Sequence, residues 1–413
     1  MRQILIISNN VLSETDNNGK TLLNIFSKIN KQNVAQLYFR GELPEVEGYR
    51  YYQLSDIDII KGKINPQKRG REVKAIPMGG KTKASAKGLI RRTPIALQIR
   101  ELFWKNSWKS SQLDEWLNDV NPDCVFFLAG DCIYAYDICE WIVEKYNCKL
   151  FTYVTDDYVL ERKKERVIER FRRKKIYESL KSISTNSDQF FTICNRMKKS
   201  YLEEFGVDSE LLFNRCQSLY DDKLMPAKEK DEEIVFMYAG SLYYGRGDIL
   251  ICLAEILGEI NSSTSARKKG KLYVYTNAIP EDEFINLLEK TGAGYYGGKL
   301  NYEQLRTKLN LCDYPVFVES FDDKEVEKVR LSFSTKIPEY MSLRKTILAI
   351  GPEEIGSMDC IKNAAVCVYD LSRLREVCER MLEDEYDKQV YAQKAWEEYK
   401  KLSELNGLEY YLS

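Results

Sequence analysis

Lys336 and Glu339 are the charged side chains whose types and spacing most clearly suggest chemistry. They lie three residues apart in the stretch LSFSTKIPEYMSLRKTILAIGP, residues 331–352. In this stretch a polar loop at 332–336 precedes a short amphipathic helix, and the apolar run 346–350 then ends at Gly-Pro, as a buried strand does. The order places both residues near a helix N-terminus, where backbone N–H groups and the dipole favour an anion. A carboxylate beside such a site can accept the two vicinal hydroxyls of a ribose.

This segment resembles the donor site of GT-B glycosyltransferases, and most of all the retaining bacterial enzymes that build surface polysaccharides. In that family a glutamate at the position of Glu339 holds the ribose of a nucleotide-sugar. The resemblance implies that Ser334 and Lys336 belong to the same donor site. The alternative interpretation is an ordinary capped helix that carries Glu339 on its surface.

One residue of the family's pattern is missing. The first glutamate of its paired-glutamate motif would stand eight residues before Glu339, where this chain has Leu331. Glu319, at the end of the apolar run 315–318, is a candidate catalytic replacement, and Asp322 and Asp323 are others.

A glycine-bearing loop follows the apolar run 234–239 and precedes an expected helix at 248–260. Members of the resembled family carry a glycine, an arginine and a later lysine in this loop, which contact the donor diphosphate. Gly240 and Arg246 fit that pattern. Ser241 stands at the position where the family often has the first arginine of this loop. We therefore expect Gly240, Ser241 and Arg246 to contact the donor. The alternative interpretation is that Arg246 is an ordinary surface charge.

The first half of the chain opens in the same way, with an apolar run at 2–8, a polar loop at 9–18 and a helix that begins at Gly19-Lys20. The resemblance implies that Gly19 belongs to a loop on the acceptor side. A phosphate-binding loop of the Walker A type would need a second glycine at a fixed spacing, and this chain lacks it.

Asp156 and Asp157 follow the expected strand 149–155. Functional loops of open α/β sheets lie beyond the carboxyl ends of their strands. In the resembled family this position carries His or Asp that faces the acceptor and the donor sugar, so both aspartates are catalytic candidates. The alternative is that they cap the basic helix expected at 161–180.

The composition excludes several classes of enzyme. The chain has 413 residues and no histidine, which rules out Ser-His-Asp and Cys-His hydrolases and any zinc site with His ligands. Its 11 cysteines form no C-x-x-C pair, and we expect reduced thiols in a cytoplasmic protein. We expect no metal ion and no cofactor.

Positive charge is concentrated in two segments. Residues 61–92 carry eleven Lys/Arg and one Glu, and residues 161–175 carry nine Lys/Arg and three Glu, so together they hold +16 within a chain of net charge −1. We interpret 61–92 as a long exposed loop. Both segments are candidates for contact with an anionic membrane surface, or are solvated faces that keep the protein soluble. They lack interleaved aromatic residues, so we expect no nucleic-acid partner.

The order of expected elements predicts an α/β protein with two Rossmann-like domains that face each other across a cleft, as in GT-B. The N-terminal, acceptor-side domain is 1–218, the linker is 219–232, and the nucleotide-sugar-binding domain is 233–383. A long C-terminal helix at 384–413 is expected to cross back to the first domain, and we assign it to that domain.

The resemblance implies a glycosyltransferase that moves a sugar from a nucleoside-diphosphate sugar to a glycan or lipid-linked acceptor. Retention is expected, because without histidine the leaving diphosphate can act as the base. The location implied is cytoplasmic, or peripheral on the inner face of the cell membrane. The main alternative is a non-catalytic GT-B subunit that supports a partner transferase; a nucleotide-sugar 2-epimerase would need histidine in its site. The sugar, nucleotide and acceptor stay open.

Overall fold

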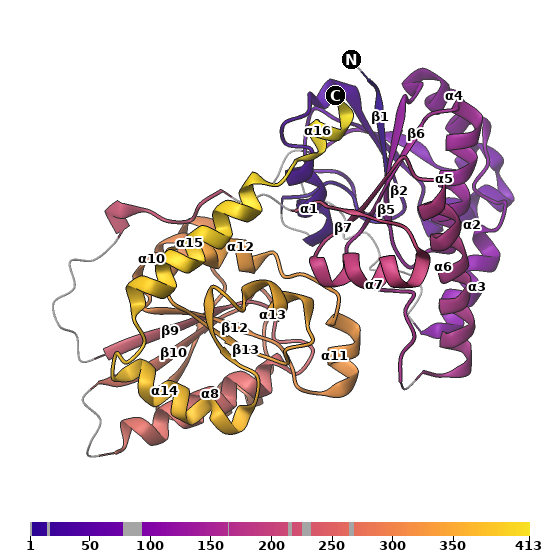
Figure 1. The fold of residues 1–413 in the computed structure, drawn as a ribbon. Coiled ribbons are helices and arrows are strands. Elements are labelled where there is room, and N and C mark those ends of the chain that lie inside the picture. The colour runs from indigo at the N-terminus through magenta and orange to yellow at the C-terminus, as the bar shows by residue number, and fades with distance from the viewer. Residues whose placement is uncertain are drawn as a thin grey trace. The chain divides into compact units, whose positions relative to one another are not determined.

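The computed structural model describes residues 2–14, 17–76, 93–163, 165–213, 217–224, 233–263 and 268–413. The chain divides into two compact units, the first of residues 1–214 with 405–413 and the second of residues 215–404 (Figure 1). Each unit is a sheet of mostly parallel strands with helices packed on it. This confirms the predicted α/β class with two Rossmann-like domains.

The sheet of the first unit has the strand order β4-β3-β2-β1-β5-β6-β7-β8 within the described residues. All of its pairs are parallel except β3 with β4. Its central strands are buried along their whole length, as their unbroken apolar runs predict. The strands are β1 (Ile4–Ser8), β2 (Val34–Tyr38), β3 (Arg50–Gln53), β4 (Arg71–Val73), β5 (Cys124–Ala129), β6 (Lys149–Val154), β7 (Gln189–Thr192) and β8 (Glu210–Leu211).

Helices cover this sheet, with α5 and α6 packed against each other on one side of it (Figure 1). Left-handed residues end several of them, including Asn121, Asn147 and Gly206, which have the conformations that asparagine and glycine adopt most easily. The helices are α1 (Asn17–Ile25), α2 (Asp56–Ile64), α3 (Pro94–Trp104), α4 (Ser111–Val120), α5 (Ile133–Tyr146), α6 (Val167–Thr185), α7 (Asn195–Phe205) and, from the C-terminus, α16 (Leu408–Leu412).

The sheet of the second unit has the order β11-β10-β9-β12-β13-β14, and all its pairs are parallel. This is the 3-2-1-4-5-6 order of dinucleotide-binding folds, in which the order of the parallel strands reverses between the two central ones. The strands are β9 (Glu233–Ala239), β10 (Lys269–Tyr275), β11 (Gly294–Gly298), β12 (Tyr314–Val318), β13 (Ile347–Ile350) and β14 (Ala365–Val368). The helices are α8 (Arg246–Asn261), α9 (Asp282–Lys290), α10 (Tyr302–Leu311), α11 (Asp323–Val329), α12 (Lys336–Met341), α13 (Gly356–Ile361), α14 (Leu374–Leu382) and α15 (Lys388–Glu404).

The end of the chain is divided differently from the prediction that assigned 384–413 to the first domain. Helix α15 belongs to the second unit, where it packs on α12 and Trp396 lies 4.0 Å from the Arg344 guanidinium. Only residues 405–413 belong to the first unit, where the ring of Tyr411 packs edge-on against Phe191. The expected linker also differs, because Leu219 is buried in the second unit and its N–H donates to Ser342; residues 225–232 lie outside the described part.

The prediction of a long loop at 61–92 is wrong for the part that the structure describes. Residues 61–64 complete α2, and Arg71–Val73 form the antiparallel edge strand β4. A capping box between Ser55 and Asp58 begins α2, a signal that the high charge of the segment obscured. Residues 77–92 lie outside the described residues.

Candidate functional site

Gly240 lies at the carboxyl end of β9, at the point where the second sheet reverses its strand order. Its N–H donates to the Tyr275 carbonyl over 2.9 Å. A Cβ here would stand 2.6 Å from the Tyr238 hydroxyl and 3.2 Å from Cε of Lys336, so a side chain would displace both. The Tyr238 hydroxyl in turn donates to the carbonyl of Ser241 at 2.6 Å. Glycine at this position therefore lets Lys336 approach the end of β9.

Gly245 caps the N-terminus of α8 with φ +72°, a left-handed conformation that glycine adopts without strain. A Cβ here would stand 2.6 Å from the Ser320 hydroxyl, which follows β12. The start of α8 thus lies against the end of the neighbouring central strand. Its first residue is Arg246, so the helix N-terminus and a guanidinium occur at the same place.

Arg246 forms an ion pair with Glu319, the residue directly after β12. Its Nε and Nη2 both donate to Oε2 of Glu319, at 3.0 and 2.7 Å. The side chains are 16% and 4% exposed, so the pair is largely shielded from water. Burial raises the pKa of Glu319, and the charges of Arg246 and Lys336 oppose that rise. The guanidinium has five N–H donors, so these two bonds leave three for a ligand.

Lys336 is the first residue of α12, and its charge acts on Glu319. The Ser334 hydroxyl accepts the N–H of Lys336 at 3.4 Å, and the N–H of Ser334 donates to Ser357 at 2.9 Å. Glu339 lies one turn further along α12 and is half-buried. The structure thus brings Arg246, Glu319 and Lys336 together around Gly240. Ser334 and Glu339 occupy the element that presents Lys336.

Leu331 is buried, at 3% exposure, in the place where the resembled family has its first glutamate. The structure does not put Asp322 in that role either, because its carboxylate caps α11 through the N–H groups of Lys324 and Glu325. Of the acidic residues that sequence reasoning considered, Glu319 is the one in contact with the cluster.

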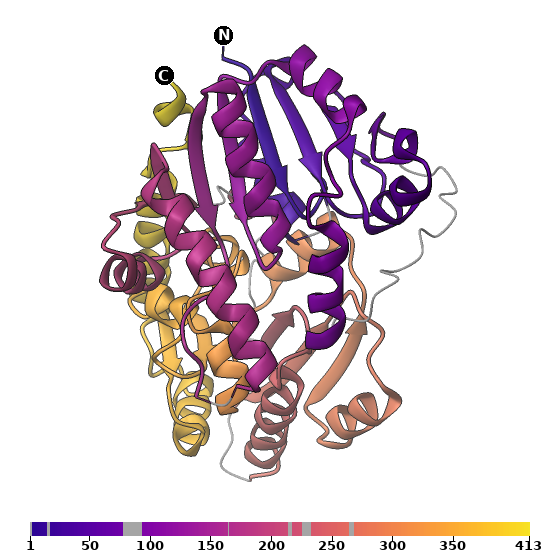
Figure 2. The ribbon, with the colours of Figure 1, turned by 90° about the vertical axis from the view of Figure 1, so that its right-hand side faces the viewer.

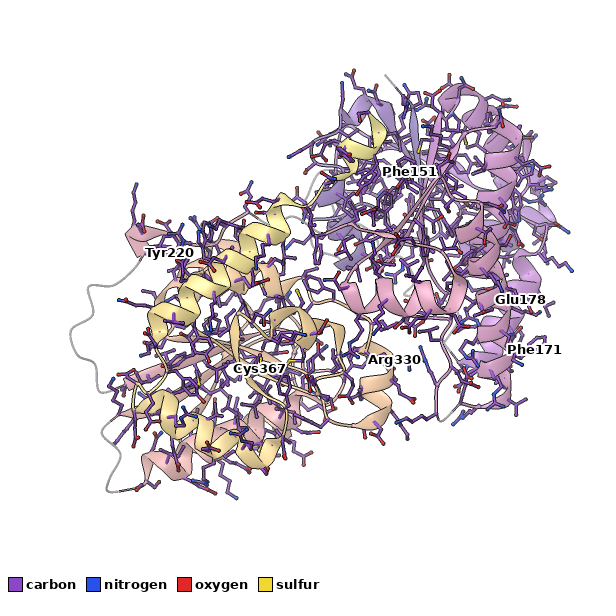
Figure 3. All side chains as sticks on the ribbon, viewed as in Figure 1. Phe151, Phe171, Glu178, Tyr220, Arg330 and Cys367 are labelled. Atoms are coloured by element: carbon purple, nitrogen blue, oxygen red, sulfur yellow. The ribbon has the colours of Figure 1, made fainter. Side chains whose placement is uncertain are left out.

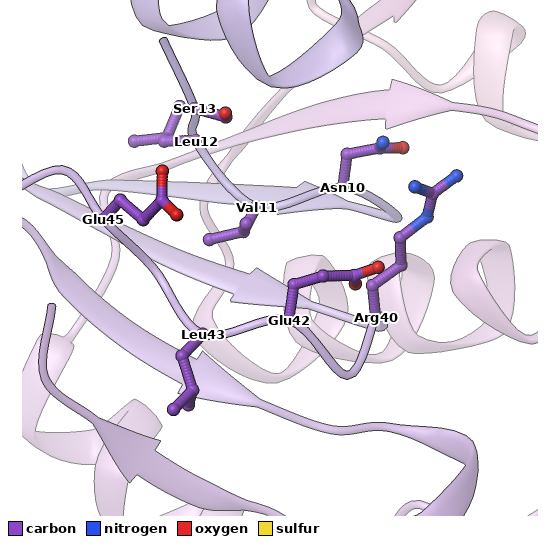
Figure 4. A pocket seen from close by; sticks show the side chains of 8 residues that line it. All are labelled: Asn10, Val11, Leu12, Ser13, Arg40, Glu42, Leu43 and Glu45. Carbon is purple, nitrogen blue, oxygen red and sulfur yellow. The ribbon is translucent and has the colours of Figure 1, made fainter. Parts of the chain in front are cut away.

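In the first unit, two cavities lie beyond the carboxyl ends of the strands, the larger between the loops after β1 and β2 and the smaller extending to the end of β5. One of about 210 Å³ is lined by Asn10, Ser13, Arg40 and Glu42, among others (Figure 4). A second, of about 80 Å³, shares Asn10 and Arg40 and extends to Asp131. Sequence reasoning missed Arg40, although a polar residue just beyond an apolar strand is the signal that singled out Asp156.

Gly19 lies in α1, next to the loop that forms the larger cavity. A Cβ at Gly19 would stand 2.4 Å from the carbonyl oxygen of Val11 and 2.9 Å from Cβ of Ser13. The absence of a side chain at Gly19 therefore allows α1 to pack closely against the loop that holds Val11 and Ser13. Asn18, the preceding residue, lines the smaller cavity.

Asp157 is buried and serves the local backbone. Its Oδ1 accepts the N–H groups of Val159 and Leu160, each at 3.1 Å, and the Tyr201 hydroxyl at 3.3 Å. Asp157 therefore does cap backbone N–H groups, as the sequence interpretation proposed, but it does not cap the basic helix. It caps a turn that lies before α6, which begins only at Val167.

Asp156 is half-buried, and its carboxylate lies 3.4 Å from the hydroxyl of Thr155. Thr155 and Tyr158 line the smaller cavity, whereas neither aspartate does. Within the described residues, no group of three or more acidic or cysteine side chains gathers that could hold a metal ion.

A scan of protein-family models finds none that matches this chain, and no curated protein sequence matches it. Solved structures do match over nearly the whole length. TarM aligns with a TM-score of 0.64 at 10% identity, covering 100% of this chain and 98% of TarM. Anabaena HepE in complex with UDP aligns at 0.59 and 10% identity, covering 97% and 95%. The chain has the GT-B fold.

WaaG, a glycosyltransferase involved in lipopolysaccharide biosynthesis, aligns at a TM-score of 0.55 and 11% identity, covering 97% of each chain. At such identities the likeness is one of fold. The GT-B fold that the sequence resemblance implied is thereby confirmed, and the second unit has the strand order expected of its nucleotide-binding domain.

Proposed function

We propose that this chain is a glycosyltransferase that binds a nucleoside-diphosphate sugar on its second unit. The observation that carries the proposal is the gathering of Arg246, Lys336 and the N-terminus of α8 at the switch point between β9 and β12. Ligands of open α/β sheets bind at such points, and two cations with a helix N-terminus favour a diphosphate. HepE, which shares this fold, was crystallised with UDP.

The proposal gives each donor residue a task. Arg246 and Lys336 bind the diphosphate, with the backbone at Gly240 and the hydroxyls of Ser241 and Ser334 beside them. Glu339 accepts the ribose hydroxyls, as the resemblance implies.

Glu319 acts as a positioning residue in this proposal. It holds two N–H groups of Arg246 and leaves the others directed at the phosphates. Its carboxylate is buried and already engaged, which favours this role over the catalytic one that the sequence suggested.

Transfer proceeds with retention and without a metal ion in this proposal. The diphosphate leaves with its negative charge stabilised by Arg246 and Lys336. It then takes the proton of the acceptor hydroxyl from the same face of the sugar. Asp156 is the better catalytic candidate on the first unit, since the carboxylate of Asp157 is already held by backbone N–H groups.

The proposed acceptor is a glycan or lipid-linked molecule used in cell-surface polysaccharide synthesis, bound by the first unit near Gly19 and the cavities at Arg40. The proposed location is the cytoplasmic side of the cell membrane.

A second candidate function is a non-catalytic GT-B subunit that supports a partner transferase. Two observations favour it: Leu331 is buried where the family's glutamate stands, and Ser241 replaces the first arginine of the phosphate loop. Turnover of a donor by the isolated chain separates the two functions.

A thermal-shift screen of nucleotides and nucleotide-sugars tests the donor site. A ligand that binds only the folded state raises the melting temperature. We expect uridine, guanosine or adenosine diphosphates to do so, and Glu339→Ala to weaken the bound one at least about tenfold, which is about 1.4 kcal/mol. Glu354→Ala, an exposed glutamate in the same unit, is the matched control. A protein that responds to no member of the panel would contradict the proposal.

A further inference from the structure

Large apolar side chains are exposed on three neighbouring helices of the first unit. Helix α3 packs against both α2 and α6 (Figure 2). Val167 at the start of α6 is 86% exposed, Ile64 at the end of α2 is 88% exposed, and Leu102 on α3 is 72% exposed. We call this surface the apolar–basic face; its exposed apolar members are Ile64, Ile95, Ile99, Leu102, Phe103, Val167 and Phe171.

The inner sides of α3 and α6 hold charged groups beside buried apolar ones such as Trp104 and Ile176. Arg100 on α3 is buried and pairs with Asp56 at 2.7 Å. Arg172 on α6 is buried and lies 3.5 Å from Asp131 and 3.9 Å from Glu101. The helical periodicity of α3 predicts that its apolar side faces the core, yet four of its large apolar residues face outward. Packing within the unit therefore does not explain them, and exposed apolar surface of this extent marks an interaction site.

Cations accompany the exposed apolar groups. The Lys63 ammonium lies 4.3 Å from the centre of the Phe103 ring, and that of Lys175 lies 4.5 Å from the centre of Phe171. Phe171 itself points away from the unit in Figure 3. Further exposed cations on or beside these helices are Lys61, Lys105, Arg166, Arg170 and Lys174.

Acidic groups on α6 and in the segment just before it are partly occupied. Glu169 accepts the N–H of Arg166 at the start of α6, and Glu165 is held by Arg173 at 2.9 Å. Glu178 is exposed, but it lies two turns beyond Phe171. The face is therefore apolar and positive together.

We infer that the apolar–basic face docks this protein on an anionic lipid bilayer. Apolar side chains enter the boundary between headgroups and acyl chains, while the lysines and arginines around them contact the acidic headgroups. The charge complementarity selects this partner, because an anionic bilayer presents a layer of acidic headgroups directly above an apolar acyl interior. Attachment is peripheral, since every helix among the described residues is too short or too polar to cross a membrane.

The inference extends the proposed function, in which the acceptor is lipid-linked, but it is tested with neither donor nor acceptor present. The 413-residue chain is sedimented with vesicles of equal parts phosphatidylglycerol and phosphatidylcholine, or of phosphatidylcholine alone, over a salt series. We expect binding to the anionic vesicles at low salt and its loss as salt screens the cations.

Two variants and a control identify the surface. Combining Leu102→Ser with Phe171→Ser should weaken vesicle binding at least about tenfold, and combining Lys174→Glu with Lys175→Glu should weaken it by a similar factor. Ile279→Ser removes a side chain that is 94% exposed on the second unit and should change nothing. All variants should keep the wild-type melting temperature and its response to nucleotide.

Three results would overturn the inference: no binding to either vesicle at low salt, equal binding to both, or unchanged binding by both double variants. Self-association that Leu102→Ser abolishes, without vesicle binding, would show that a second copy of the chain covers the face. A protein that binds vesicles but no nucleotide would retain this inference and lose the proposed function.

Discussion

The ion pair between Arg246 and Glu319 makes the donor site costly to alter. Arg246→Ala leaves a carboxylate that is 4% exposed without its main partner, and Glu319→Ala leaves a guanidinium that is 16% exposed in the same position. Removing one member of a buried ion pair costs about 3–5 kcal/mol. In a domain of this size about 1 kcal/mol corresponds to roughly 2–4 °C, so each variant should melt roughly 6–20 °C below wild type.

The double variant decides whether the pair accounts for that loss. Arg246→Ala with Glu319→Ala leaves neither charge buried, so it should cost less than the sum of the single variants, by about 1–3 kcal/mol. Urea unfolding of the four proteins, followed by fluorescence, measures this coupling. Arg373→Ala, in an exposed pair with Glu376, should be near neutral. Single losses that add within about 0.5 kcal/mol would show that the two side chains do not stabilise each other.

Four further predictions follow from the described geometry. Burial raises the pKa of Glu319, and the rise should be larger in Arg246→Ala, where the opposing positive charge is gone. The folded variant then binds a proton more tightly than the unfolded chain, so its loss of stability should be greatest above the raised pKa and should shrink as pH falls towards 4–5. Denaturation at several pH values checks this. Gly240→Ala should weaken nucleotide binding at least about tenfold in a calorimetric titration, because its Cβ would overlap a tyrosine hydroxyl and the Lys336 side chain. Asp157→Ala should lower stability by about 1.5–3 kcal/mol in urea unfolding, since it strands buried N–H groups, whereas Asp156→Ala should not. Product NMR should show retention at the anomeric carbon, and the rate should survive EDTA; an inverted product with loss of activity in Asp156→Asn would contradict the proposed mechanism.

The central strands of both sheets could be predicted from sequence because each is a short apolar run that turn residues bound. The run 234–239 followed by Gly240 is one example, and the structure places β9 and its loop there. Such signals need only neighbouring residues, which the sequence presents side by side.

Contacts between distant residues could not be predicted in the same way. Arg246 and Glu319 are 73 residues apart, and nothing local to either shows that the switch point brings them together. Helix α3 shows a second limit, because its apolar periodicity is real but faces outward, while Arg100 turns inward to Asp56. Periodicity indicates that a helix has two faces, and the charge partners supplied by other elements decide which of them is buried.

Donor turnover by the purified 413-residue chain is the most direct test of the proposed transferase activity. The protein is incubated with a panel of uridine, guanosine and adenosine diphosphate sugars, and release of the free nucleoside diphosphate is followed with wild type, Glu339→Ala and the control Glu354→Ala. We expect wild type and the control to consume at least one donor, and Glu339→Ala to be slower by at least about tenfold at low donor concentration. Equal rates for wild type and Glu339→Ala would contradict the assigned site, and tight nucleotide binding with no consumption of any donor would favour the non-catalytic subunit.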